Sequence, residues 1–149
     1  MGRMQPFEAG RMRPAEARLR VALAEDHCRV LEELQQLLSG EFDVVAAVNG
    51  GVELVEAAER TRPDVVVSDI AMPDLDGIEA ARRILCRGAS AAVVLLTSHD
   101  NEELLRRATR AGILGFVLKV DAGDELLDAV RAASRGSSYI SRSVGNVDS

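Results

Sequence analysis

Residues 63–77 read PDVVVSDIAMPDLDG, and this stretch shows the pattern that decides the fold. An apolar run of strand length leads to Asp69, and a turn rich in proline, aspartate and glycine follows. Apolar residues then recur at helical spacing from Ile78 to Leu85. Short continuous apolar runs are typical of buried strands, and a period of about 3.6 residues is typical of a helix packed by one face. The stretch therefore predicts a strand, a turn and a helix.

The same unit repeats on both sides of this stretch. Strands are expected at residues 21–24, 42–48, 64–68, 92–96 and 114–118, each followed by a helical pattern. The helix predicted at residues 51–60 is expected to turn inward Val52, Val55 and Ala58. Strands that alternate with helices predict an α/β fold with a parallel sheet covered on both faces. Five units are too few for an eight-stranded barrel, so we expect an open, doubly wound sheet.

Length and composition fit one globular domain, because 149 residues with 47% hydrophobic and 28% charged side chains can bury a core. No apolar run reaches the roughly 18 residues that a membrane span needs, so no membrane contact is expected. Residues 1–18 lack periodicity and an apolar signal core, and we interpret them as a flexible leader. Without an export signal, Cys28 and Cys86 are expected to be free thiols in the cytoplasm, with Cys86 packed in or beside the core.

The charge distribution argues against direct binding of nucleic acid. Residues 1–20 hold five arginines and two glutamates, a net charge of +3, so the total of −6 leaves −9 for the rest of the chain. Nucleic-acid binding depends on lysine and arginine that neutralise phosphates. An acidic domain of this kind is not expected to bind DNA by itself.

Acidic, hydroxyl or lysine side chains follow four of the five predicted strands. In chain order they are Glu25 and Asp26, Asp69, Thr97 and Ser98, and Lys119. The carboxyl ends of parallel strands meet at one edge of the sheet, where ligands bind in open α/β folds. Lys119 is the only lysine among 18 basic residues, which suggests that its position needs a compact charge on a flexible stem rather than a guanidinium fork.

These residue types are suited to phosphoryl transfer. Three carboxylates at one point repel one another unless a cation is present, and Mg²⁺ prefers such oxygen ligands together with phosphate oxygens. A carboxylate can act as the nucleophile and form an aspartyl phosphate. Lys119 and Thr97 would then bind phosphoryl oxygens that are absent in the resting state, and this difference in contacts is what a switch requires.

Four motifs now support a resemblance to a known family. They are Glu25-Asp26, residues 69–77, residues 95–98 and residues 115–119, in order at successive strand ends. Together they resemble the receiver domain of bacterial two-component response regulators over residues 19–136, with residues 119–127 most similar to the NarL/FixJ (LuxR-type) subfamily. The resemblance implies a flavodoxin-like, five-stranded parallel sheet with strand order 2-1-3-4-5, flanked by five helices. It also implies Mg²⁺ as cofactor and a sensor histidine kinase as phosphoryl donor.

The resemblance assigns the acceptor and the metal ligands. Asp69 is the expected phospho-acceptor. Asp26, Asp69 and the backbone carbonyl of Ala71 are the expected direct ligands of Mg²⁺, with Glu25 acting through water. Ala71 is also expected to tune the lifetime of the phosphorylated state.

The remaining roles concern the phosphoryl group and the switch. Thr97, Ser98 and Lys119 are expected to contact the phosphoryl oxygens. Phe116 matches the aromatic residue that rotates inward when Thr97 is drawn toward the phosphate, although the family often has tyrosine there. His99 is expected to tune how fast water reaches the phosphoryl group.

The resemblance also implies an organisation of the chain. Residues 1–18 would be the leader, 19–136 the receiver, and 137–149 a linker stub toward a DNA-binding helix-turn-helix domain. That domain has no room before Ser149, so we expect either an excised receiver or a gene product without its output half. DNA would be contacted only through the absent domain, and phosphorylation would favour a homodimer. The protein is not expected to be an enzyme beyond its own phosphorylation and autodephosphorylation.

Several alternatives stay open on the residues alone. A phosphatase with Asp69 as nucleophile usually needs a second acid where Ala71 stands, and a nucleotide-binding module would need a glycine-rich loop in place of the acidic turn after the first strand. A zinc centre formed by His27, His99 and Cys28 lacks paired ligand spacing. The fold could also serve as a phosphorylation-independent dimerisation module. Taken singly, the acids are more common as caps, and those at positions 74 and 76 are expected to be turn and cap residues.

Overall fold

The computed structural model describes residues 18–90 and 92–142 and contains one parallel sheet with helices on both faces. The strands are β1 (Arg20–Ala24), β2 (Asp43–Val48), β3 (Val65–Asp69), β4 (Ala92–Thr97), β5 (Gly115–Leu118) and β6 (Tyr139–Ile140). The helices are α1 (Cys28–Ser39), α2 (Gly51–Thr61), α3 (Gly77–Cys86), α4 (Glu102–Arg110) and α5 (Ala122–Ser134), with a short 3₁₀ turn, η1 (Lys119–Asp121), before α5.

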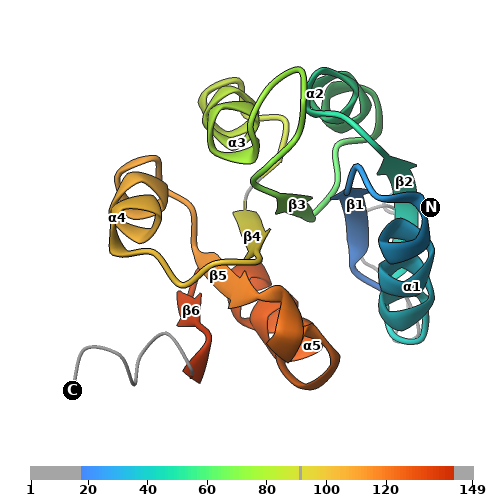
Figure 1. Cartoon of the computed structure of the whole chain (residues 1–149). Coiled ribbons are helices and arrows are strands. Elements are labelled where there is room, and N and C mark those ends of the chain that lie inside the picture. Colours follow the sequence, from blue (N-terminus) through green and yellow to red (C-terminus); the bar gives the residue numbers. More distant parts are fainter. Residues whose placement is uncertain (1–17, 91, 143–149) are drawn as a thin grey trace, which may run out of the picture.

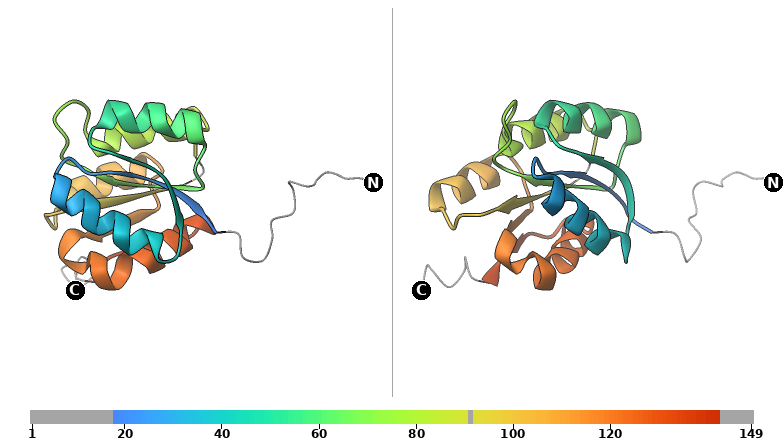
Figure 2. Two further views of the ribbon diagram at one scale, coloured as in Figure 1. Left: turned by 90° about the vertical axis from the view of Figure 1, so that its right-hand side faces the viewer. Right: turned by 45° about the vertical axis from the view of Figure 1, so that its right-hand side comes forward.

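The helices form two layers, with α1 and α5 on one face of the sheet and α2, α3 and α4 on the other (Figures 1 and 2). Because side chains alternate along a strand, Val21 and Leu23 enter the core beneath α1 and α5, whereas Ala22 and Ala24 enter the core beneath α2 and α3. Both cores are apolar and closed. The polar residues at the carboxyl ends of the strands lie beside these cores, at an edge that solvent can reach.

The strand order β2-β1-β3-β4-β5 confirms the predicted doubly wound topology, and β6 adds a short sixth strand beside β5. This strand lies within residues 137–149, the predicted linker. The amide of Tyr139 donates to the carbonyl of Leu114 at 2.9 Å, and the amide of Ser141 donates to that of Phe116 at 2.9 Å. A strand of two residues is too short to show a periodic pattern in the sequence. Tyr139 and Ile140 form a strand because the edge of β5 offers free backbone groups for them to pair with.

Two expected packing positions are wrong. Val52 is 44% exposed, because the buried stripe of α2 runs through Gly51, Leu54, Val55 and Ala58 and begins at a glycine. These positions satisfy helical spacing better than a stripe that begins at Val52. Cys86 ends α3 and is exposed.

Both termini reach beyond the described part of the chain. The predicted leader lies outside it except for Arg18, and the predicted linker lies outside it from residue 143 onward. Within residues 18–90 and 92–142, no helix is both long and apolar enough to cross a membrane.

Candidate functional site

One pocket of about 260 Å³ lies at the carboxyl ends of the central strands. Its walls come from the segments that follow β1, β3, β4 and β5. They comprise Asp26, His27, Asp69, Ile70, Ala71, Thr97, Ser98, His99, Leu104 and Lys119. The pocket therefore brings together the predicted site residues from distant parts of the chain, with Glu25 and Phe116 as the two exceptions.

Lys119 connects two buried carboxylates at the base of this site. Its Nζ lies 3.1 Å from Oδ2 of Asp69 and 2.9 Å from Oε1 of Glu25. Asp69 ends β3 and is 4% exposed, and Glu25 directly after β1 is fully buried. Burial by itself would lower the pKa of Lys119, but the hydrogen bonds to Glu25 and Asp69 together outweigh burial and raise it. The ammonium group therefore stays charged at neutral pH between the two carboxyl groups.

The donor set around Asp26 fits a hard divalent cation. The ligand atoms of Glu25, Asp26 and His27 all lie within 4.8 Å of one another, and the exposed Asp26 shares the pocket with Asp69. Carboxylate oxygens at a solvent-accessible position suit Mg²⁺, which keeps several waters and takes one or two carboxylates. His27 joins this group, although the sequence suggested it only as a ligand in a zinc centre with His99 and Cys28 and not beside the acid pair. Its place directly after the acid pair was the only signal in the sequence.

The loop after β3 holds Asp69 from the other side. The amide of Ala71 makes a long hydrogen bond of 3.4 Å to Oδ1 of Asp69, and the amide of Gly77 donates to the carbonyl of Ile70 at 2.8 Å. A Cβ atom at Gly77 would lie 2.1 Å from the carbonyl oxygen of Asp69, so only glycine allows α3 to begin this close to β3. Ala71 is exposed and lines the pocket from this loop.

Thr97 ends β4 with its hydroxyl engaged inside its own loop. Its Oγ1 donates to the carbonyl of His99 and accepts from the amide of His99, both at 3.2 Å. Thr97 is buried, whereas Ser98 and His99 are exposed at the pocket wall. A ligand at Asp69 would have to exchange these local hydrogen bonds in order to recruit the hydroxyl.

The comparison with known proteins decides the family. The sequence model of the response regulator receiver domain matches residues 21–131. The chain belongs to this family. Similar curated proteins are the transcriptional regulatory protein YxjL of Bacillus subtilis and the nitrate/nitrite response regulator homolog of Haemophilus influenzae. YxjL is 37% identical over 121 residues, which are 80% of this chain and 56% of YxjL. The H. influenzae protein is 31% identical over 132 residues, which are 87% of this chain and 64% of that protein.

Solved structures agree with this membership. A LuxR-family two-component response regulator from Aurantimonas has a TM-score of 0.81 at 30% identity, and the match covers 87% of this chain and 94% of that one. The isolated receiver of RcsB from Salmonella, in the presence of the phosphomimetic BeF₃⁻, has a TM-score of 0.78 at 25% identity, with 87% and 98% covered. The chain spans between 56% and 64% of the length of the two curated relatives named above.

The predicted switch aromatic of this receiver domain lies outside the pocket that contains Asp69. Phe116 is 2% exposed and lines a second cavity of about 250 Å³ with Leu105 and Ala108 of α4 and Ile140 of β6. It neighbours Leu95 across the β4–β5 ladder, two residues before the pair of Thr97 with Leu118. The side chain of Phe116 is thus buried beside Leu105 and Ala108 of α4.

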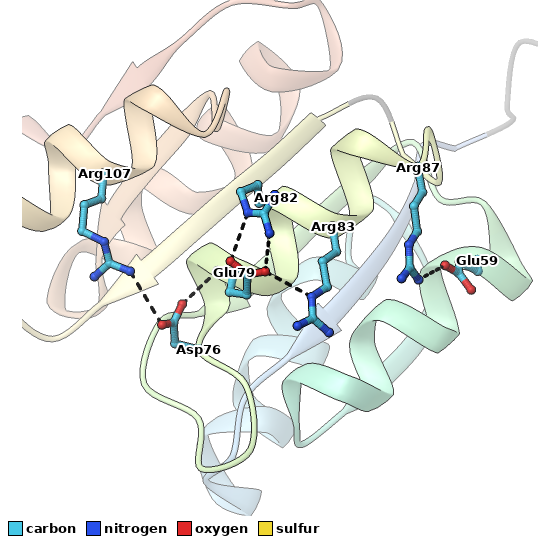
Figure 3. A network of polar contacts seen from close by, with 7 residues as sticks. All are labelled: Glu59, Asp76, Glu79, Arg82, Arg83, Arg87 and Arg107. Carbon is cyan, nitrogen blue, oxygen red and sulfur yellow. Dashed lines mark hydrogen bonds and ion pairs between the residues drawn. The ribbon is translucent and has the colours of Figure 1, made fainter.

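Two acids of the β3–α3 loop, Asp74 and Asp76, contact helices other than the one that follows the loop. Asp76 caps α3 as predicted and accepts from the amide of Glu79 at 2.9 Å. It also faces Arg107 of α4 at 3.7 Å, as Figure 3 shows. Asp74 contacts α2 instead, where it accepts from the amides of Gly51 and Val52. No local spacing could have predicted this contact, because 23 residues separate Asp74 from Gly51.

The surface of α3 near this loop carries further ion pairs (Figure 3). Glu79 accepts from Arg82 at 2.6 Å and from Arg83 at 3.2 Å, and these contacts lower its pKa from 4.5 to about 2. Arg87 of the C-terminal α3 boundary pairs with Glu59 of α2 at 2.5 Å. All of these side chains are partly or largely exposed, so we ascribe little stability to them.

Proposed function

We propose that this receiver domain accepts a phosphoryl group on Asp69 from a sensor histidine kinase or a small phosphodonor and changes conformation as a result. One observation carries the proposal. The only lysine of the chain places its ammonium 3.1 Å from the Asp69 carboxylate, in a site that also holds Glu25, Asp26 and Thr97.

The transfer needs a nucleophile and a charge balance. A carboxylate oxygen of Asp69 attacks phosphorus, and the bond from phosphorus to the donor's imidazole nitrogen breaks. The electron pair goes to the imidazole, which then takes up a proton. Lys119 offsets the negative charge that gathers on the phosphoryl oxygens. Asp26, Asp69 and the carbonyl of Ala71 would hold Mg²⁺, with Glu25 acting through water. When bound, the ion neutralises charge on the transferred group.

The conformational change follows from a change of partners. Lys119, Thr97 and Ser98 would gain phosphoryl oxygens as acceptors, and the Thr97 hydroxyl would leave the backbone of His99. The side chain of Phe116 extends from β5 to a cavity that it shares with Leu105 and Ala108 of α4. A shift of Thr97 would therefore change the packing of Phe116 and the surface formed by α4, β5 and α5. Water later attacks phosphorus, the bond to Asp69 breaks, and inorganic phosphate leaves. His99 and Ala71 flank that approach.

The output is proposed from the relatives. Their names describe transcriptional regulators, and a solved RcsB structure that resembles this chain is a complex with DNA. We propose that phosphorylation controls transcription through a DNA-binding domain outside this chain, with a homodimer as the active form. The exposed free thiols of Cys28 and Cys86 suit a reducing cytoplasm, which is the compartment of this proposal.

Intact mass after incubation with acetyl phosphate and Mg²⁺ tests the acceptor. We expect one added phosphoryl group on the wild type, none on Asp69→Asn, and none when EDTA is present. Asp43→Asn is the matched control, because Asp43 is an exposed aspartate at the start of β2, and it should behave like the wild type.

Absence of an adduct, with beryllofluoride-treated samples as a control for rapid hydrolysis, would contradict the proposal. That result would favour the alternative in which the domain acts as a phosphorylation-independent dimerisation module. Steady release of phosphate from a phosphomonoester would favour the phosphatase instead.

A further inference from the structure

The tip of the β3–α3 loop is attached to the start of α2 by one side chain. Asp74 Oδ1 accepts from the amide of Gly51 at 3.0 Å, and Oδ2 accepts from the amide of Val52 at 3.1 Å. The amide of Leu75 also donates to Oδ1 at 2.8 Å. A helix leaves its first amides without partners inside the helix, and α2 has no side-chain cap of its own. Asp74 therefore caps a helix that begins 23 residues earlier in the chain.

Glycines make this contact close. A Cβ atom at Gly51 would lie 2.2 Å from the carbonyl oxygen of Leu75, and one at Gly50 would lie 3.2 Å from Oδ2 of Asp74. The loop and the helix thus meet backbone to backbone. A larger residue at Gly51 would push the loop away from α2 and break both hydrogen bonds.

Charge adds to the hydrogen bonds. The carboxylate faces the positive end of the 11-residue helix α2, and the amides of Gly51 and Val52 lower the pKa of Asp74. Asp74 is therefore ionised throughout the neutral range, and its contact with α2 does not depend on pH there.

The attachment matters because the middle of this loop is exposed to solvent. Ala71, Pro73 and Asp74 are exposed, and the hydrogen bond from Ala71 to Asp69 is long at 3.4 Å. Met72 is the one residue between Ala71 and Asp74 that is buried, at 8% exposure. Leu75 is partly buried and also packs against the core, so Met72 and Leu75 anchor the loop on either side of Asp74 through apolar contacts. The hydrogen bonds of Asp74 to α2 add directional contacts that fix the backbone between these anchors.

We infer that Asp74 is a positioning residue, which fixes the backbone of Ala71 beside Asp69 by attaching the β3–α3 loop to the N-terminus of α2. The inference rests on the proposed function, in which the Ala71 carbonyl is a ligand of Mg²⁺. Groups that orient metal ligands from outside the coordination shell commonly change metal affinity by about 10–100-fold when they are removed.

The experiment is a titration of the chain with Mg²⁺, followed by the amide resonances of Asp69 and Ala71. For Asp74→Ala we expect the half-saturating Mg²⁺ concentration to rise about tenfold. Asp74→Asn keeps one carbonyl oxygen for the amides of α2 and should lie between Asp74→Ala and the wild type. Asp43→Ala removes an exposed charge at the start of β2, away from the β3–α3 loop, and should match the wild type.

Phosphorylation by acetyl phosphate separates positioning from chemistry. At saturating Mg²⁺ the rate for Asp74→Ala should return to within about threefold of the wild type, because a weakened Mg²⁺ site is then filled. A rate that stays low at saturating Mg²⁺, with normal Mg²⁺ affinity, would overturn the inference.

The other outcomes are also decisive. The inference is overturned if Asp74→Ala binds Mg²⁺ as tightly as the wild type does. It is also overturned if the amide resonance of Ala71 in the wild type does not respond to Mg²⁺. If Asp74→Ala does not fold, Asp74→Asn decides in the same way. If the wild type binds Mg²⁺ but never accepts a phosphoryl group, the proposed function fails while the titration still tests Asp74.

Discussion

The loops after β3 and β4 face each other across the same pocket, but they are built differently. The β3–α3 loop is attached to α2 through Asp74, closed at its base by Gly77, and faces α4 through Asp76. The β4–α4 loop makes its described hydrogen bonds within itself. The Thr97 hydroxyl bonds to His99, and the Asn101 side chain accepts from the first amides of α4 at 2.8 and 3.2 Å.

The helices that follow these loops differ in the same sense. Helix α3 buries five residues, whereas α4 fully buries Ala108 alone. Helices with few buried apolar contacts open at low cost, and moving elements are drawn from such regions. The proposed acceptor Asp69 therefore lies on the more firmly held side of the pocket. Thr97 stands on the side that is free to move.

The largest effect on stability should come from adding a side chain at Gly77, at the base of the β3–α3 loop. Gly77→Ala places a methyl group 2.1 Å from the carbonyl of Asp69, and we expect the free energy of unfolding to fall by about 3 kcal/mol or more. Gly123→Ala is the matched control near the start of α5, where a Cβ would meet nothing within 4 Å. It should raise stability by up to about 1 kcal/mol.

Urea unfolding of both glycine variants measures this difference. A loss for Gly77→Ala no larger than about 1 kcal/mol would mean that the β3–α3 loop yields easily, contrary to the comparison.

The caps of the two helices give an intermediate effect. Asp76→Ala removes the cap of α3 and should lower the global free energy of unfolding by about 1 kcal/mol. Asn101→Ala removes the cap of α4 and should mainly speed hydrogen exchange in residues 102–105, because α4 opens locally before the domain unfolds. Native-state hydrogen exchange with both variants distinguishes these outcomes. Equal, purely global effects would remove the distinction between the two helices.

The smallest effect concerns surface carboxyls on the same two helices. Glu79 of α3 has two arginine partners and a pKa of about 2. Glu103 of α4 also has a lowered pKa, and the largest cause is its hydrogen bond with Arg106. Since both pKa values lie below those of the unfolded chain, the stabilisation is present above the unfolded pKa. It is lost as the pH falls toward the folded pKa. Both groups are exposed, so the effect on stability is small.

Carboxyl carbon resonances in a pH titration measure these values directly. Arg82→Ala should raise the pKa of Glu79 more than Arg83→Ala does, because Arg82 makes the stronger contact, and neither should move Glu103. A pKa of Glu79 that stays near 2 in the double variant would exclude the arginines as its cause.

Much of this molecule could be predicted from local pattern. Apolar runs and helical periods predicted five strands and their helices, because burial of one face or one run is a local requirement. The convergence of Asp26, Asp69, Thr97 and Lys119 was also predictable, since parallel strands bring their carboxyl ends to one edge. The sequence alone thus determined the fold class and the place of the candidate site.

The tertiary structure alone decided the contacts between elements that are distant in the chain. The attachment of Asp74 to α2, the pairing of β6 with β5 and the exposure of Val52 all depend on how closely two backbones approach. The same holds for Lys119, whose ammonium lies between Glu25 and Asp69, a pairing with Glu25 that the pattern of the sequence does not indicate. Periodicity reports which side of an element is buried. The distance between two elements follows from packing the whole chain, and that packing made one loop of the pocket rigid and left the other free.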